Sequence, residues 1–362
     1  MIPMKLRPSL ALLGILLAVV AVGIPAAALE AGKAGAETTP SLHGTIALTG
    51  STCICASESS QVYLFDLASG KLSQLTKGPV QHGAIGWSPD GSRLLVWESG
   101  QGRQGLYSMR ADGSSEVRLA KRWAGEASWS PDGHRVAYLA PGGYLASPTG
   151  TVHRLYVISA NGTHRRLLVK RALGVGSGDF SWAPNGGRIV FVGNLCGTPS
   201  NPFCLGRNLL TVKTNGKPTI RQIGPSHHSG ISQPAWSPDG SRIAALIEGR
   251  GLTVMRTDGS HAEVVPCGTA PVWSSDSSWI ATYGDGMNCV AHPDGTGARS
   301  WSGSGSGITF SPTSTWLAYV GGLIHEPSGV LYVANVDASQ TIQVLNDQSL
   351  SFGTPLWRGG TG

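Results

Sequence analysis

The sequence predicts an all-β protein: a seven-bladed β-propeller of four-stranded antiparallel blades, with the ring closed by the C-terminal strand. Three observations lead to this prediction. A tight-turn motif that follows an aromatic residue recurs along the chain, its copies are about 45 residues apart, and a second apolar run with its own turn follows each copy. A repeat of this length with several short strands is typical of propeller blades.

The stretch "AIGWSPDGSRLLVW", residues 84–97, shows why the motif forms a turn between two strands. Pro89 pre-sets φ for the second position of a type I turn, Asp90 can bond its own backbone, and Gly91 takes the positive φ that closes the turn. The apolar run that begins at Leu94 has the pattern of a half-buried strand. The unit is therefore predicted to be a strand, a tight turn and a second strand.

The remainder of each repeat adds two more strands. Most of the second apolar runs end in Asn-Gly, Asp-Gly or Ser-Gly, which favour turns with positive φ, and another short apolar segment follows. Each blade is thus expected to hold a strand A that ends at the aromatic residue, and then strands B, C and D. The motif begins at Trp87, Trp129, Trp182, Trp236, Trp273 and Phe310, and a partial copy, "PLWRGG", contains Trp357.

The first blade lacks a strand A of its own. Strands B, C and D occur seven times, beginning with "GTIALTG" at Gly44, whereas the strand before the first turn motif belongs to the second blade. The C-terminal segment "SFGTPLWRGG" supplies the missing strand. Residues 353–357 are therefore predicted to pair beside Thr45 to Thr49, which leaves the ring without an open end.

The pattern Trp-x-Ser-Pro-Asp-Gly-x-Arg-Ile resembles the PD40 repeat, the WD40-like unit of TolB-type β-propellers, and covers residues 43–362. The resemblance implies a fold and leaves the function open. TolB itself carries an α/β domain before a six-bladed propeller, whereas a short linker precedes seven blades here. The related prolyl oligopeptidases add an α/β-hydrolase domain, for which this sequence shows no counterpart.

Residues 1–28 are expected to be a signal peptide or an uncleaved membrane anchor. Lys5 and Arg7 precede an uncharged apolar run over residues 9–29, and small residues before Ala28 fit a cleavage site. The same run is long enough to serve as a membrane tether if it is retained. Both alternatives place the propeller outside the cytoplasm, as a periplasmic, secreted or membrane-anchored protein, because positive residues stay inside.

Composition agrees with an exported propeller. The chain has 362 residues, of which 51 are glycine and 13% are charged, and the segment 29–42 is expected to be a flexible linker. The net charge of +6 is modest and does not indicate a nucleic-acid partner. The densest basic stretch, "HRRLLVKRAL", is interpreted as a solvated edge strand, with attraction to an anionic envelope polymer or lipid as the alternative.

Six cysteines in an exported chain favour disulfides. Two of them bracket the segment "GTPSNPF", two others belong to the region of the sixth blade, and the last two form a Cys-x-Cys that is strained as a disulfide. A metal or redox site is the alternative for that last pair. The expected pairs are Cys196 with Cys204, Cys267 with Cys289, and Cys53 with Cys55.

The sequence shows few signs of catalysis. It contains no Gly-x-Ser-x-Gly elbow, no Gly-Lys followed by Ser or Thr, and no His-Glu-x-x-His, and it indicates no metal site and no cofactor. The repeated acids Asp90, Asp132 and Asp239 all lie in the tight turn, where they are expected to cap backbone N–H groups. The repeated tryptophans are expected to fill the seams between blades. A binding protein is therefore favoured over an enzyme.

Candidate binding residues lie on one face of the predicted ring. Because strand direction alternates, the A–B and C–D turns share one face, and the B–C loops share the other face with the D–A connections. The loops on that second face are longer and chemically mixed, and binding groups usually lie on such loops. The candidates expected around a central funnel there are His82, Arg122, Trp123, Tyr144, His227, His228, His325 and Asp347.

The preferred function is a binding or protein-interaction scaffold in the cell envelope, with a glycan or peptide as ligand and a protein or glycan as partner. The alternative is a metal-dependent polysaccharide lyase resembling oligogalacturonate lyase, a seven-bladed propeller of the same type that binds a divalent metal with several histidines and a glutamine. A third alternative is the sensor or partner subunit of a complex. The lyase reading would use His82, His227, His228, His325 and Gln233, but His227 and His228 are adjacent and point apart in an extended segment.

Overall fold

Strands alone build the part of the chain that the structure describes. The computed structural model describes residues 42–52, 60–122, 125–144, 151–173, 180–193, 208–224, 230–284, 286–302, 307–321 and 329–359. These ranges contain 29 strands, and they hold no helix of the length and apolarity that a membrane crossing requires. The residues from Leu42 onward form one structural unit.

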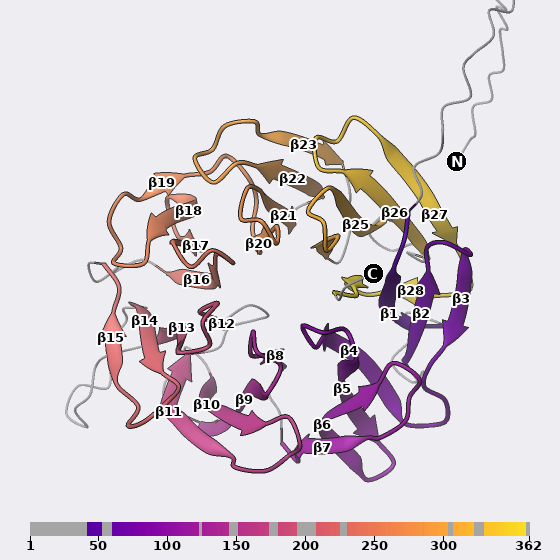
Figure 1. The fold of residues 1–362 in the computed structure, drawn as a ribbon, viewed down its shortest axis with the longest axis horizontal. Coiled ribbons are helices and arrows are strands. Elements are labelled where there is room, and N and C mark those ends of the chain that lie inside the picture. The colour runs from indigo at the N-terminus through magenta and orange to yellow at the C-terminus, as the bar shows by residue number, and fades with distance from the viewer. Residues whose placement is uncertain are drawn as a thin grey trace, which may run out of the picture. The chain divides into compact units, whose positions relative to one another are not determined.

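The strands form seven antiparallel blades arranged in a ring, as predicted (Figure 1). Strand A of each of blades 2 to 6 lies nearest the centre, as β4, β8, β12, β16 and β20 show. Blade 1 contains β1 (Thr45–Ser51), β2 (Gln61–Asp66) and β3 (Lys71–Gln74), and blade 2 contains β4 (Gln81–Trp87), β5 (Arg93–Gly100), β6 (Arg103–Arg110) and β7 (Val117–Ala120). Blade 3 contains β8 (Ala127–Trp129), β9 (Arg135–Tyr144), β10 (Thr151–Ser159) and β11 (Arg166–Leu173). Blade 4 contains β12 (Phe180–Trp182), β13 (Arg188–Gly193), β14 (Asn208–Lys213) and β15 (Ile220–Gln222). Blade 5 contains β16 (Ile231–Trp236), β17 (Arg242–Ile247), β18 (Gly251–Arg256) and β19 (Glu263–Val264). Blade 6 contains β20 (Val272–Trp273), β21 (Ile280–Gly284), β22 (Met287–Ala291) and β23 (Arg299–Ser302). Blade 7 contains β24 (Ile308–Phe310), β25 (Trp316–Gly321), β26 (Val330–Asn335) and β27 (Thr341–Asn346).

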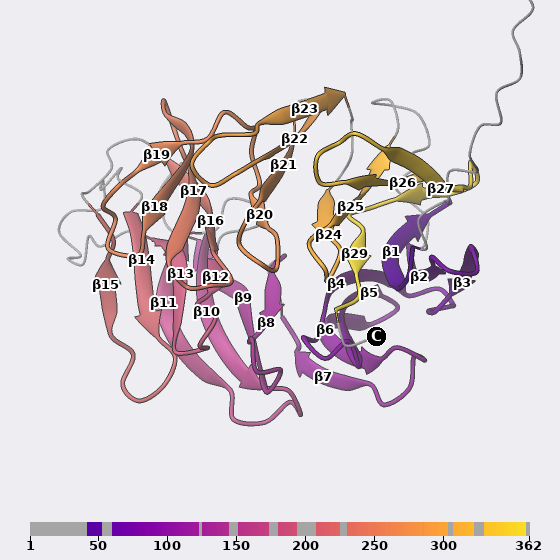
Figure 2. The same ribbon diagram turned by 45° about the horizontal axis from the view of Figure 1, so that its top comes forward.

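The C-terminal strand closes the ring, which confirms the predicted topology. It is split into β28 (Ser351–Phe352) and β29 (Leu356–Trp357), and both segments pair antiparallel with β1. Figure 2 shows β29 between β1 and β24 of the last blade. The next residue, Arg358, donates from Nε to the carbonyl of Gly91 at 2.6 Å and places its guanidinium over the ring of Trp87 at 5.2 Å. The end of the chain is thus tied to blade 2 as well as to blade 1.

The tryptophans that open the motif link consecutive blades. The indole N–H of Trp87 donates to the carbonyl of Leu356, which immediately precedes Trp357 in the preceding blade. Trp129 donates in the same way to Gly86, the residue before Trp87. Trp182 and Trp273 repeat this bond to Ser128 and Ala235, whereas Trp236 donates to Gly240 in its own turn. Each of these rings therefore fills a seam, and most of them also bind the neighbouring strand A.

The turn of the motif has the geometry expected from its residues. Gly91 has a φ of 66°, and the carboxylate of Asp90 accepts hydrogen bonds from the Ser88 hydroxyl and the Ser92 N–H. In the two weaker copies a serine replaces the glycine and still takes the left-handed conformation: Ser277 has a φ of 63° and Ser314 a φ of 61°. The repeated acids are therefore turn caps, as expected.

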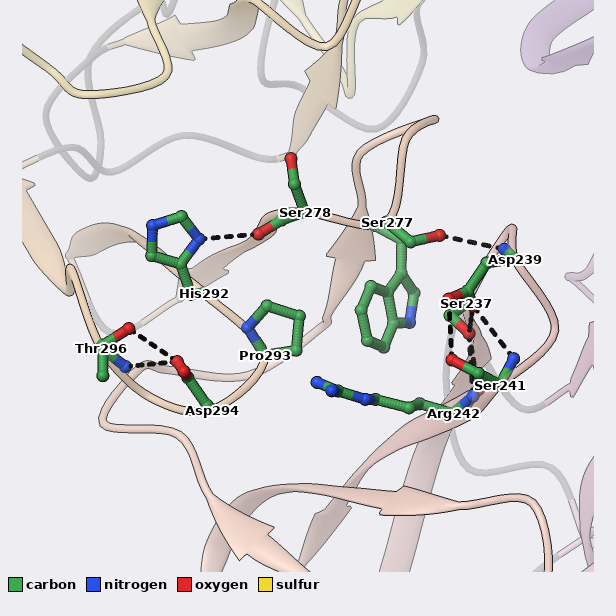
Figure 3. A pocket seen from close by; sticks show the side chains of 11 residues that line it. Ser237, Asp239, Ser241, Arg242, Ser277, Ser278, His292, Pro293, Asp294 and Thr296 are labelled. Atoms are coloured by element: carbon green, nitrogen blue, oxygen red, sulfur yellow. Dashed lines mark hydrogen bonds between the residues drawn. The ribbon is translucent and has the colours of Figure 1, made fainter.

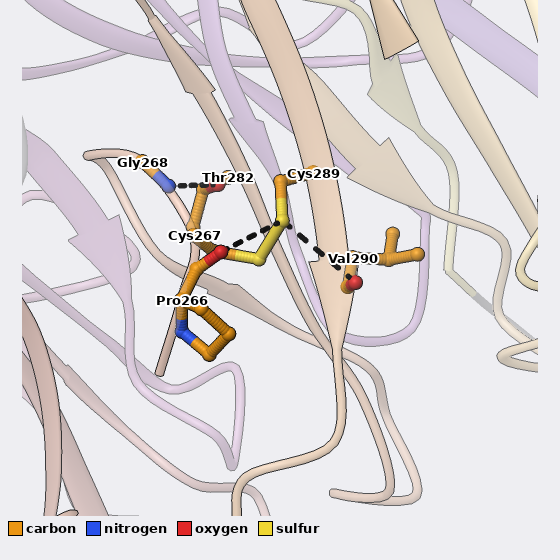
Figure 4. The surroundings of a disulfide bond; sticks show 6 residues. All are labelled: Pro266, Cys267, Gly268, Thr282, Cys289 and Val290. Carbon is orange, nitrogen blue, oxygen red and sulfur yellow. Dashed lines mark hydrogen bonds between the residues drawn. A yellow bond between two sulfur atoms is a disulfide. The ribbon is translucent and has the colours of Figure 1, made fainter. Parts of the chain in front are cut away.

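A disulfide joins Cys267 to Cys289, one of the pairs expected from the sequence, with the two Cα atoms 5.6 Å apart (Figure 4). Cys267 lies in the connection from β19 of blade 5 to β20 of blade 6, and Cys289 lies in β22. Beside the bond, the N–H of Gly268 donates to Oγ1 of Thr282 in β21. The bond therefore fastens the connection between two blades to the middle of blade 6. The other four cysteines lie outside the described residues.

Candidate functional site

The described members of the predicted binding set lie in separate places. His82 is buried in β4, where its Nε2 lies 3.4 Å from Oε1 of the buried Glu98. Asp347, in the connection from blade 7 to β28, accepts hydrogen bonds from the N–H and hydroxyl of Ser349. Tyr144 ends β9 and is described by its backbone alone. Trp123, His227, His228 and His325 lie outside the described residues.

Arg122, by contrast, lines a groove of about 600 Å³ at the seam between blades 2 and 3. One wall is strand β7 of blade 2 and the two residues that follow it. The other wall is formed by β9 and β10 of blade 3. Gly162, in the turn between β10 and β11, and Arg165, which directly precedes β11, complete this wall. Because β7 is a strand D, the groove lies away from the central strands of the ring (Figure 1).

The pairing of β9 with β10 explains which side chains form the second wall. Tyr156 pairs with Tyr138, and Arg154 pairs with Ala140. Residues two apart in a strand share a face, so Arg154 and Tyr156 point to the same side of β10. The rings of Tyr138 and Tyr156 are stacked, with centroids 5.5 Å apart, and the guanidinium of Arg165 lies 5.1 Å from the centre of the Tyr156 ring.

The groove is strongly basic. Among the described residues that line it, five carry cationic side chains and none carries a carboxylate. Within the part of the chain that the structure describes, none of the five lies within 4.0 Å of a carboxylate oxygen. Arg118 uses one nitrogen to donate to the carbonyl of Gln104 and lies over the ring of Tyr107. The five cationic residues are Arg118, Lys121, Arg122, Arg154 and Arg165.

A second, smaller pocket of about 370 Å³ lies among the turns of blades 5 and 6 (Figure 3). Arg242 points into it toward Pro293 and Asp294. Its carboxylates are already occupied, because Asp239 accepts from the hydroxyls of Ser237 and Ser241, and Asp294 accepts from the N–H and hydroxyl of Thr296. This pocket therefore offers a ligand fewer free groups than the groove does.

Reasoning from sequence identified only one end of the groove. Arg122 was a candidate because it follows a strand D, and the basic stretch that contains Arg165 was interpreted as a solvated edge. Tyr138 and Tyr156 carried no signal as single residues. An indication of the site was the alternation of Arg154, Tyr156 and Ile158 in β10, which places two polar side chains on a face directed at the neighbouring blade.

Comparisons with known proteins agree with this fold. No protein-family model and no curated protein matches the sequence. Among solved structures, TolB from Acinetobacter baumannii matches with 12% identity and a TM-score of 0.53 over 87% of this chain. The chain has the TolB-like β-propeller fold. It spans 66% of the length of that TolB structure.

Two other solved structures share the propeller. An oligogalacturonate lyase in complex with manganese matches with 16% identity over 83% of this chain and 85% of its own, with a TM-score of 0.56. A nidogen–laminin complex matches with 11% identity over 87% of this chain and 98% of the matched one, with a TM-score of 0.50. At these identities the likeness of the TolB-like propeller to each of them concerns the fold alone.

Of the residues proposed from sequence for a lyase-type metal site, His82 and Gln233 are described, and His227, His228 and His325 lie outside the described residues. His82 is paired with Glu98, and Oε1 of Gln233 accepts a hydrogen bond from the N–H of Ala270 at 2.8 Å. The described ranges hold no group of three His, Cys, Asp or Glu side chains with the spacing of a metal site.

Proposed function

We propose that this TolB-like propeller is an exported binding module of the cell envelope, and that it holds a polar ligand, a glycan or a peptide, in the groove between blades 2 and 3. The observation that carries the proposal is the groove itself. It combines a volume suited to a small ligand with stacked aromatic rings and cationic side chains that take part in no described ion pair. The rigid blades on both sides keep these groups in place.

The chemistry of the groove suits a ligand with both a flat surface and polar groups. Tyr156 is half-buried and presents part of its ring to the groove, and Arg154 is exposed beside it. Aromatic rings contact sugar faces or peptide side chains, while guanidinium groups donate several hydrogen bonds in a fixed plane. The groove therefore has donors and an apolar surface within the same site.

Export is part of the proposal and has two supports. The Cys267–Cys289 disulfide is of a kind that persists in oxidising compartments. The N-terminal sequence, with Lys5 and Arg7 before an apolar run, has the pattern of a secretory signal or an anchor. A protein outside the cytoplasm meets glycans and peptides of the envelope as its available ligands.

The test is binding to glycan and peptide arrays, followed by calorimetry with the best ligand. Arg122→Ala and Arg154→Ala are each expected to weaken binding about fivefold or more, because each removes a charged hydrogen-bond donor from the groove. Neither change is expected to move the melting temperature by more than about 2 °C, since both side chains are exposed. The matched control is Arg242→Ala, which removes an exposed arginine from the separate pocket among the turns of blades 5 and 6.

Asp112→Ala, in the C–D turn of blade 2, is a second control, because Asp112 is not among the residues that line the groove. Loss of affinity confined to the Arg242 and Asp112 variants would contradict the proposal and would place binding on the turn face. Unchanged affinity in both groove variants, with a ligand that binds the wild-type chain, would also contradict it.

A further inference from the structure

We infer that the ligand of this groove carries an oxyanion, a carboxylate or phosphate group, which binds between Arg154, Arg165 and the hydroxyl of Tyr138. The inference rests on the proposed function, because it names the chemical group that the same groove recognises. Three independent observations support it: the charge of the lining, the unpaired hydroxyl of Tyr138, and the positions that the strand register gives to the arginines.

The first observation is the uncompensated charge. Five cationic side chains line one groove, the described lining residues include no carboxylate, and the described ion pairs include none of the five. Like charges collected in one depression repel each other, and an anion placed among them removes that repulsion.

The second observation is a buried donor without an acceptor. Tyr138 is 1% exposed and is one of the lining residues, and its buried hydroxyl has no hydrogen-bond partner at normal distance, although Arg165 lies near enough to lower its pKa. Burial has the larger effect and raises the pKa of the hydroxyl, which is a hydrogen-bond donor at neutral pH. A buried hydroxyl without a partner destabilises the folded chain, and a bound oxyanion would accept its proton in a hydrogen bond.

The third observation is the placement of the two arginines in the wall that contains Tyr138. Tyr138 pairs with Tyr156, and Arg154 lies two residues away on the same face of β10. The Arg165 guanidinium lies over the Tyr156 ring, which is stacked on the Tyr138 ring. A planar guanidinium offers two parallel N–H groups to a carboxylate or phosphate, and both arginines line the groove together with Tyr138.

Calorimetry on the full chain with three probes tests the inference. The probes are inorganic tripolyphosphate, citrate and the neutral sugar maltotriose. We expect at least one of the two anions to bind about tenfold or more tightly than maltotriose, and the stronger anion tells whether phosphate or carboxylate is the preferred source.

Tyr138→Phe removes only the hydroxyl and keeps the stacked ring. We expect it to weaken binding of the preferred anion about tenfold, the loss of one hydrogen bond to a charged group, while the melting temperature stays the same or rises. Arg165→Gln is expected to weaken the same anion by a similar factor. Arg242→Gln, in the other pocket, is expected to leave it within about twofold.

The outcomes separate this inference from the proposed function. Failure of both anions to bind, or equal binding by the wild-type chain and the Tyr138→Phe variant, overturns the inference even if an array ligand still depends on Arg122. Anion binding that depends on Tyr138 and Arg165 supports the inference even if the array ligand binds the Arg122→Ala and Arg154→Ala variants with unchanged affinity, which would overturn the proposed function alone.

Discussion

Single residues repeat their roles from blade to blade even where their identity changes. Arg93, at the start of β5, donates to the carbonyls of Ser108 and Ser115 and so covers the C–D turn of its own blade. In blade 6 the corresponding residue is Trp279, which stacks on His292 of its own C–D turn with ring centroids 3.9 Å apart. Tryptophan in place of arginine thus keeps the contact with the C–D turn, but the contact is ring stacking instead of hydrogen bonding.

The turn aspartates give a prediction at the same scale. Hydrogen bonds from the hydroxyl of Ser88, then from the N–H and hydroxyl of Ser92, hold the pKa of Asp90 below its ordinary value of 3.8. Asp90→Ala should therefore lower the free energy of unfolding at neutral pH by about 1 kcal/mol, a typical net value for hydrogen bonds on an exposed turn. Chemical denaturation at pH 7 measures this difference.

The pH dependence of that difference follows from the direction of the shift. Because the folded pKa is lowered, the carboxylate stabilises the fold above the unfolded pKa, and this stabilisation is lost as the pH falls through the folded pKa. The gap between the wild-type chain and the Asp90→Ala variant should therefore start to close as the pH falls toward 3.8 and should narrow further below it. A gap that stays constant down to acid pH would show that the carboxylate is not the stabilising group. Glu263→Ala, on the exposed edge strand β19, serves as the control.

At the scale of elements, the turns made the strands predictable. Each Ser-Pro-Asp-Gly or its weaker copy marks the end of a strand A and the start of a strand B, because proline and a positive-φ residue cannot continue a ladder. The closing strand was predicted over residues 353–357, and its partner β1 was correct. Its division into β28 and β29, with Ser351 as the first paired residue, followed no local pattern in the sequence.

Contacts between blades were less predictable than strands. Blades 3 and 4 are joined into one sheet through the pairing of Ala172 with Gly193, which depends on how far β11 extends. The groove likewise depends on contacts between strands. Tyr138 and Arg154 lie in one site because of the β9–β10 register and because β7 of the neighbouring blade forms the other wall. A single sequence fixes periodicity within a blade but carries little information about which side chains meet across a seam.

The disulfide gives a prediction at this scale. It closes a segment with a sequence separation of 22, for which the chain-entropy estimate of its stabilisation is about 3 kcal/mol. Replacing both Cys267 and Cys289 by serine should lower the free energy of unfolding by about that amount, and a reductant should lower the melting temperature of the wild-type chain. Peptide mapping without reduction establishes the bond itself. A reductant that has no effect on a chain shown to carry the bond would contradict this account. The pairs Cys196–Cys204 and Cys53–Cys55 stay predictions for the same map.

At the scale of the whole molecule, the ring depends on one short contact. The closing strand covers β1, Trp357 is buried in the cluster between the first and last blades, and Arg358 reaches the Trp87 ring of blade 2. A chain that ends at Asn346 should lose cooperative thermal unfolding, because it exposes one edge of β1 and the apolar side chains beside it.

Arg358→Ala tests the same closure without removing a strand. It should lower the melting temperature while leaving unfolding cooperative, since it deletes one hydrogen bond and one cation–π contact. A chain ending at Asn346 that melts cooperatively within a few degrees of the full chain would refute the closure scheme.

The central claim for the whole molecule is that ligands bind at the seam of blades 2 and 3. Hydrogen exchange followed by mass spectrometry, on the full chain with and without its best array ligand, tests this claim most directly. The account predicts slower exchange in residues 117–122 and 154–165, which form the two walls of the groove. Protection confined to residues 237–242 and 292–296, in the pocket among the turns of blades 5 and 6, would contradict it.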